Sequence, residues 1–135
     1  MKKGLIFITI IIFYVSLDYL FYQSLNHFYK PKNPYDEYYD SIYKKSNKNI
    51  GNYALIYLIN SFAIFYLCVL KNPFIHPMLR YIHNFLVGLT VYAIHTIYLH
   101  HISKYPKNLI LLDISFNSLA YPTIAFLALN LINRI

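Results

Sequence analysis

Three ionisable side chains stand inside long apolar runs of this 135-residue sequence, namely Asp18, His95 and Asp113. An ionised side chain at the centre of a membrane helix costs about 2.5 to 3.5 kcal/mol, so such residues usually face a bundle interior or a water-filled cavity. A carboxyl group in low-dielectric surroundings can also act as a protonatable site. The three residues therefore predict either such a site or hydrogen bonds that hold the helices together, and we favour the second interpretation.

The depths of these residues in their apolar runs are similar. Each lies about four residues from the run end that faces one common side of the membrane, which is about 6 Å deep at 1.5 Å per residue. Asn117 follows Asp113 by one helical turn, and Tyr92 precedes His95 by three residues. Such spacings share one helix face. We therefore predict a buried polar cluster of Asp18, Tyr92, His95, Asp113 and Asn117, with no catalytic or metal-binding residue among them.

Other reactive patterns are weak or absent. His95, His100 and His101 resemble one histidine box of the membrane di-iron desaturases and hydroxylases, which need several such boxes. On a helix these spacings separate the rings by about 140 and 240 degrees, so they do not share a face. Cys68 is the only cysteine, and the sequence has no phosphate-binding glycine loop and no G-x-S-x-G or H-E-x-x-H motif. We predict no metal and no cofactor.

The composition is that of a membrane protein. Hydrophobic residues make up 58% of the chain and charged residues only 13%, which is too little charge to cover a soluble domain of this length. The formal net charge is +7, but the basic residues are spread over the termini and the connecting segments. A nucleic-acid binder concentrates basic residues on one face, so we predict no nucleic-acid partner.

Four apolar runs of 18 to 24 residues can position the polar cluster, because each is long enough to cross a bilayer as a helix. We therefore predict an all-α fold, an integral membrane bundle of four transmembrane helices that forms one domain over residues 1–135. A polar segment between the first two runs is expected to lie outside the hydrocarbon and to be partly ordered by its tyrosines. The predicted helices cover residues 4–22, 53–70, 81–99 and 109–132, and the polar loop covers residues 23–52.

Several short motifs resemble those of a four-span bacterial membrane family, domain of unknown function 2177. Residues 17–21 read Leu-Asp-Tyr-Leu-Phe and resemble the family's Leu-Asp-x-Leu-Trp. Residues 113–116 read Asp-Ile-Ser-Phe and are similar to its Asp-Ile-x-Trp. Residues 89–92 and the connector at Pro106 add to the resemblance, which covers most of the chain.

The sequence departs from this family at several motif positions. Phe21 and Phe116 stand where the family has tryptophan, and Asn117 stands where it has glycine. His95 and Thr96 replace a Tyr-Asp pair, so the acidic residue of the third helix is lost. The family has no established activity. The resemblance therefore implies the four-span topology and draws attention to the two aspartates.

For function, we predict a multi-pass membrane protein of non-enzymatic, structural or accessory character. The alternative is a proton-coupled transporter or a small-solute binding membrane protein that uses Asp18, His95 and Asp113. A membrane enzyme ranks third, because the chain lacks a complete metal-ligand set and a nucleophile paired with a base.

The predicted surroundings are those of an integral membrane protein. Membrane lipids are the expected partners, and a homo-oligomer or other membrane proteins are further candidates. The amino-acid usage is typical of AT-rich coding sequence, so we expect a bacterial inner membrane, or a host or virion membrane if the chain is viral. Four spans would leave five basic residues on one side and seven on the other, which leaves the orientation open.

Overall fold

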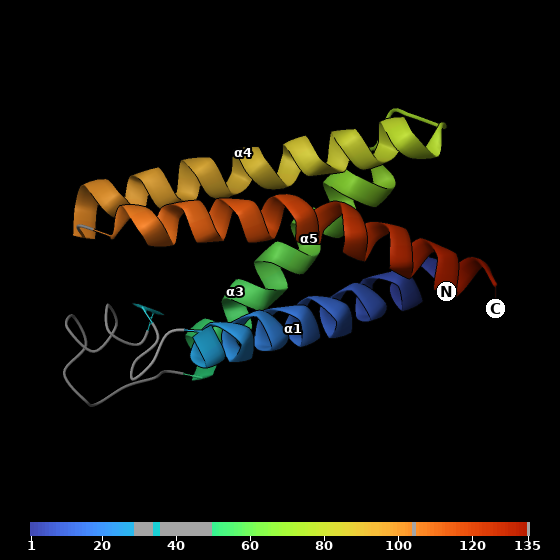
Figure 1. The fold of residues 1–135 in the computed structure, drawn as a ribbon. Helices are drawn as coiled ribbons and strands as arrows, with labels where there is room; N and C mark the ends of the chain where they lie inside the picture. The colour runs from blue at the N-terminus through green and yellow to red at the C-terminus, as the bar shows by residue number, and fades with distance from the viewer. Residues whose placement is uncertain (29–33, 36–49, 104, 135) are drawn as a thin grey trace.

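The computed structural model describes residues 1–28, 34–35, 50–103 and 105–134, and within these ranges it contains helices and no strand (Figure 1). The prediction of an all-helical fold is confirmed. In chain order the elements are α1 (Lys2–Phe28), α3 (Ile50–Ala63), the π-helical segment η1 (Ile64–Leu70), α4 (Pro77–Ser103) and α5 (Lys107–Asn133).

The helices extend further than the apolar runs that predict them. α1 continues to Phe28 and α3 begins at Ile50, so the predicted polar loop 23–52 is wrong at both ends. Hydropathy marks where the hydrocarbon ends, whereas a helix continues until Pro or Gly disfavours it, and residues 23–28 contain neither. The prediction about the loop tyrosines concerns mainly residues outside the described ranges.

Three of the helices, α1, α4 and α5, are long and apolar enough to cross a membrane. The second predicted span is divided between α3 and η1, and its apolar part, Ala54–Leu70, is shorter than the other three. The described part of the chain is therefore an all-helical membrane protein with three candidate spans and a shorter fourth apolar helix.

Helix α5 is the central element of the bundle. It runs alongside α4 and also packs against α1 and η1, while α3 crosses steeply near α1 (Figure 1). Buried residues make up 44% of the most apolar stretch of α5, against 11% for α1 and for α4. The start of α1 and the end of α5 lie at the same end of the bundle. The outward faces of α1 and α4 are thus available to lipid.

A glycine allows α4 and α5 to approach closely. A Cβ atom placed on Gly88 would lie 2.5 Å from the carbonyl oxygen of Asn117 and 3.1 Å from the Cβ atom of Tyr121. Small residues at such crossings let helix backbones pack tightly in membranes, where little else drives helices together. Gly88 therefore fixes the separation of α4 and α5 beside Asn117.

We predict that Gly88→Ala destabilises the protein by about 1 to 3 kcal/mol, because the added methyl group must push the Asn117 backbone away. Thermal unfolding of the purified protein in detergent measures this change. Gly4→Ala is the matched control, since nothing lies within 4 Å of a Cβ atom there. Equal melting temperatures for Gly88→Ala and Gly4→Ala would show that the two helices are not held in this close contact.

Candidate functional site

The five residues of the predicted polar cluster all line one pocket, whose volume is about 470 Å³. We call this cavity the acidic pocket. It lies where the later part of α1, the first part of α3, the later half of α4 and the first part of α5 meet, at the end of the bundle away from the two chain termini (Figure 1). Its lining includes Asp18, Tyr92, His95, Asp113 and Asn117.

Asp18 of α1 is held by a tyrosine from α3. The Tyr57 hydroxyl donates a hydrogen bond of 2.6 Å to Asp18 Oδ2. The Tyr57 ring also makes an edge contact with the ring of Tyr14, with the centroids 5.9 Å apart. Asp18 is half-buried, so its carboxyl group is partly screened from lipid while one of its oxygen atoms has a protein donor.

Asp113 of α5 accepts hydrogen bonds from two tyrosines. Tyr105 donates to Asp113 Oδ2 at 2.5 Å, and Tyr35 donates to Asp113 Oδ1. Tyr105 is itself fixed, because its side chain is buried and its carbonyl oxygen accepts a hydrogen bond of 2.5 Å from His100 Nδ1. The short connector between α4 and α5 thus positions both the tyrosine and the carboxyl group that it contacts.

A chain of hydrogen bonds joins three helices beside the pocket. Tyr14 of α1 donates to Asn117 Oδ1 of α5 at 2.9 Å, and Tyr14 and Tyr92 of α4 are joined by a hydroxyl pair, also at 2.9 Å. A phenol has one proton, so Tyr92 must be the donor to Tyr14. Asn117 Nδ2 in turn donates to the backbone carbonyl of Asp113. The hydrogen bonds therefore run in one direction, from Tyr92 to Tyr14, from Tyr14 to Asn117 and from Asn117 to the Asp113 carbonyl.

His95 lines the pocket, but its side chain is exposed. The prediction that His95 faces the bundle interior is therefore wrong. Its position on α4 turns it to the open side of the pocket, where its ring makes an edge contact with the Tyr92 ring at 5.9 Å between centroids. In the described ranges no hydrogen bond joins two of Asp18, His95 and Asp113, although Asp113 interacts electrostatically with both of the others.

The chemistry of the lining is acidic and aromatic. Of the sixteen lining residues that the structure describes, two are aspartates, nine are aromatic, and none is lysine or arginine. Phe21 of α1 and Phe116 of α5 stack on each other with centroids 4.3 Å apart, which closes the pocket between these two helices. These are the positions where the sequence departs from tryptophan in the family that it resembles. The arrangement can accept protons or attract a cation.

Within the part of the chain that the structure describes, no three His, Cys, Asp or Glu side chains lie close enough together to hold a metal ion. The three histidines of the sequence pattern are separated. His100 contacts the connector before α5, whereas His95 lies at the pocket opening.

Sequence reasoning missed the three tyrosines that hold the carboxyl groups, Tyr35, Tyr57 and Tyr105. It took charged side chains as the main signal and included only Tyr92 among the tyrosines. A signal existed for Tyr57, which precedes Asn60 by one helical turn and so shares a polar face with it in an apolar run. Tyr105 lies in a connector whose conformation the sequence does not reveal.

The fold and the pocket together define a helical membrane protein with an acidic, tyrosine-lined cavity near one end. Comparison with known proteins adds no relative: no protein-family model, no curated protein and no solved structure matches the chain. The resemblance to the four-span family of unknown function stays a prediction.

We predict that Tyr14→Phe lowers the free energy of unfolding by about 1 to 3 kcal/mol, because the Asn117 amide oxygen is left buried without this donor. Thermal unfolding in detergent measures the loss. Tyr98→Phe is the matched control, since the Tyr98 side chain is 61% exposed on the outer face of α4. If Tyr14→Phe and Tyr98→Phe both have the melting temperature of the wild type, the hydrogen bond between α1 and α5 does not contribute to stability.

Proposed function

We propose that this protein is a multi-pass membrane protein that binds a small organic cation in the acidic pocket. One observation carries the proposal. Two aspartates from different helices, Asp18 and Asp113, open on a cavity of about 470 Å³, and none of its described lining residues is lysine or arginine.

The charge of the pocket requires a positive partner or protons. Carboxylates in low-dielectric surroundings are costly unless a cation, a proton or strong donors compensate. The tyrosine hydroxyls on Asp18 and Asp113 supply donors but leave the charge in place. His95 is the one basic side chain among the described lining residues, and it interacts electrostatically with Asp113. A cationic solute would supply the missing charge.

The aromatic lining favours an organic ammonium group over a metal ion. Aromatic faces attract ammonium and guanidinium groups and recognise quaternary ammonium ligands. Rings from four parts of the chain surround the two carboxyl groups, those of Tyr14, Phe21, Tyr57, Tyr92 and Phe116 among them. A bare metal ion would need several oxygen ligands at short distances. At least one oxygen atom of each aspartate already accepts a hydrogen bond from a tyrosine hydroxyl group.

Protons compete for the same carboxyl groups, so the proposal includes solute binding that weakens as the pH falls. This is the solute-binding form of the alternative predicted above. A purely structural role, with the polar residues only holding the helices together, predicts no saturable binding at this pocket.

We further propose that the chain crosses the membrane four times, in a bacterial inner membrane or in a host or virion membrane. From Ile50 to Leu70, α3 and η1 together would reach roughly 30 Å at 1.5 Å per residue, about the thickness of the hydrocarbon core. They lead from the pocket end of the bundle, near the end of α1, to the start of α4 at the other end (Figure 1). The resemblance to a four-span family supports the same topology.

The binding proposal predicts saturable binding of choline to the protein in lipid nanodiscs, measured by isothermal titration calorimetry at neutral pH. Asp18→Asn and Asp113→Asn should each weaken binding by about tenfold or more, because one charge contact worth about 1.4 kcal/mol is lost. Lowering the pH should weaken wild-type binding, because protonation removes the negative charge.

Two controls separate binding from folding. The uncharged choline isostere, in which carbon replaces the nitrogen, should not bind, since it has the same shape and no charge. Ser24→Ala, a change on an exposed part of α1, should bind choline as the wild type does. Absence of saturable binding in the folded wild-type protein would reject this function and favour the structural role.

The topology proposal predicts the sidedness of the connector before α4. In a Cys68→Ala background, Ile75→Cys should react with a membrane-impermeant thiol reagent from the side that holds both termini, and Lys107→Cys from the other side. Ile75 is 94% exposed and Lys107 is also exposed. Labelling of both positions from one side would mean that α4 does not cross. Labelling of Ile75→Cys from the side opposite to the N-terminus would mean that α3 with η1 does not cross.

A further inference from the structure

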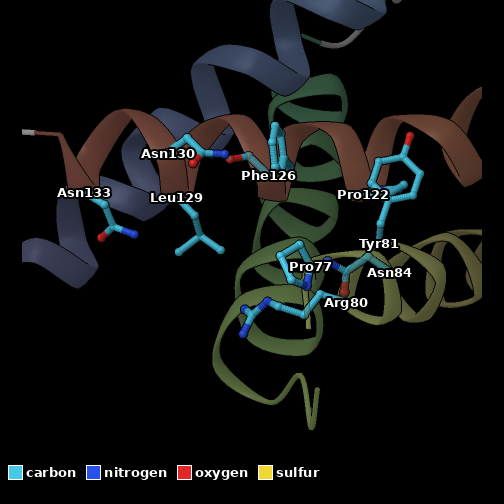
Figure 2. Close-up of a pocket in the computed structure, with 9 residues that line it drawn as sticks. All are labelled: Pro77, Arg80, Tyr81, Asn84, Pro122, Phe126, Leu129, Asn130 and Asn133. Carbon is cyan, nitrogen blue, oxygen red and sulfur yellow. Dashed lines mark hydrogen bonds between the residues drawn. The ribbon is translucent and has the colours of Figure 1, made fainter. Parts of the chain in front are cut away.

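We infer that a second pocket, at the opposite end of the bundle, binds the phosphodiester of an anionic phospholipid. Its volume is about 320 Å³, and it lies between the first turns of α4 and the last turns of α5 (Figure 2). We call it the arginine pocket, because Arg80 is the one charged residue among the described residues of its lining.

The arginine pocket follows from helix periodicity. Its lining residues are spaced by three or four positions, which places them on one face of each helix. Those from α4 are Pro77, Arg80, Tyr81 and Asn84, and those from α5 are Pro122, Phe126, Leu129, Asn130 and Asn133. The lining on α5 extends over eleven positions, or about 16 Å along the helix axis. The pocket is therefore an elongated groove that starts at the end of the bundle.

Arg80 supplies the charge for an anion. Arg80 as a whole residue is half-buried, and its guanidinium group donates one hydrogen bond, from Nη1 to the carbonyl oxygen of Phe74 at 3.2 Å. A guanidinium group has five N–H donors, so others remain. In the described ranges no acidic side chain forms an ion pair with Arg80. The positive end of the α4 dipole, at Pro77, adds to the attraction for an anion.

Arg80 is also held in place by its surroundings. Asn72 donates from Nδ2 to the Arg80 backbone carbonyl at 3.3 Å and to Asn84 Oδ1 at 2.9 Å. Asn72 Oδ1 in turn accepts a hydrogen bond from the backbone N–H of Phe74. The connector that presents the carbonyl group to the guanidinium is therefore tied to α4, which orders the arginine before any ligand arrives.

The groove has apolar side chains from α5, namely Pro122, Phe126 and Leu129, beside its polar groups. Figure 2 shows Asn133 and Leu129 at the end of α5 and Pro122 beside Tyr81 further inward. Phe126, between these regions, is 54% exposed. A free phosphate would contact only the polar groups around Arg80, whereas a phospholipid would also cover the apolar side chains with its acyl chain. The groove therefore fits a lipid better than an inorganic anion.

The charge of the lining also selects among phospholipids. Phosphatidylcholine and phosphatidylethanolamine carry an ammonium group beside the phosphate, and among the described residues no carboxylate lines this pocket to receive it. Phosphatidylglycerol has no ammonium group, and its one negative charge matches the positive charge of Arg80. Basic sites between helices near a membrane surface recognise anionic headgroups in the same way.

The test is native mass spectrometry of the full-length protein released from nanodiscs that contain equal amounts of phosphatidylglycerol and phosphatidylcholine. The wild-type protein should retain phosphatidylglycerol preferentially. Arg80→Gln should reduce that retention by about tenfold, the effect of one charge-assisted contact. Lys71→Gln is the matched control, because Lys71 is a basic residue of the same end of the bundle and does not line the pocket.

A second variant covers the case in which Arg80→Gln does not fold. Phe126→Ala changes an exposed side chain and should lower retention of the lipid while Arg80 is intact. Glycerol phosphate, the free headgroup, should not displace the bound lipid at equal concentration. Unchanged retention in both variants, equal retention of the two lipids, or displacement by glycerol phosphate would each overturn the inference.

Discussion

The hydrogen bond between Tyr14 and Asn117 is the contact on which the arrangement of the bundle depends. Both side chains are buried, and the bilayer offers no water to replace a lost partner. The same Asn117 lies against Gly88, so the closest approach of α4 to α5 and the attachment of α1 to α5 meet at one residue. Tyr92 extends the contact from α1 to α4 through its own hydroxyl group.

The position of the acidic pocket follows from this contact. Asn117 Nδ2 bonds to the backbone carbonyl of Asp113 one turn earlier on α5, and Asp18 lies one turn after Tyr14 on α1. The two aspartates therefore point from adjacent helices into the space just beyond the hydrogen-bonded layer. Tyr57 then joins α3 to the same space through Asp18. The groups that hold the helices together also set the spacing of the two carboxyl groups. The same residues would therefore serve both a structural role and the proposed binding role.

The helical fold and the membrane class could be predicted from the sequence, because long apolar runs have few other stable conformations in lipid. Asp18, His95 and Asp113 lie at similar depths in three apolar runs, which was enough to predict that they lie close together. All three line the acidic pocket. The helix ends could not be predicted. Hydropathy indicates which residues lie in the hydrocarbon, but a helix can continue past that boundary into the aqueous phase. The π-helical conformation of η1 and the tyrosine partners of the carboxyl groups depend on how neighbouring helices pack, and no single-helix periodicity contains that information.

The two pockets differ in charge and are separated by packed residues. On α5 the lining of the acidic pocket ends at Asn117, and the lining of the arginine pocket begins at Pro122. Between them Tyr121 is fully buried and donates a hydrogen bond of 2.7 Å to Asn60 Oδ1 on α3. A cation that passed from one pocket to the other would have to break this bond and then meet Arg80. The two pockets are therefore separate sites in a single copy of the bundle, so the proposed cation would enter and leave at one end and the proposed lipid would bind at the other.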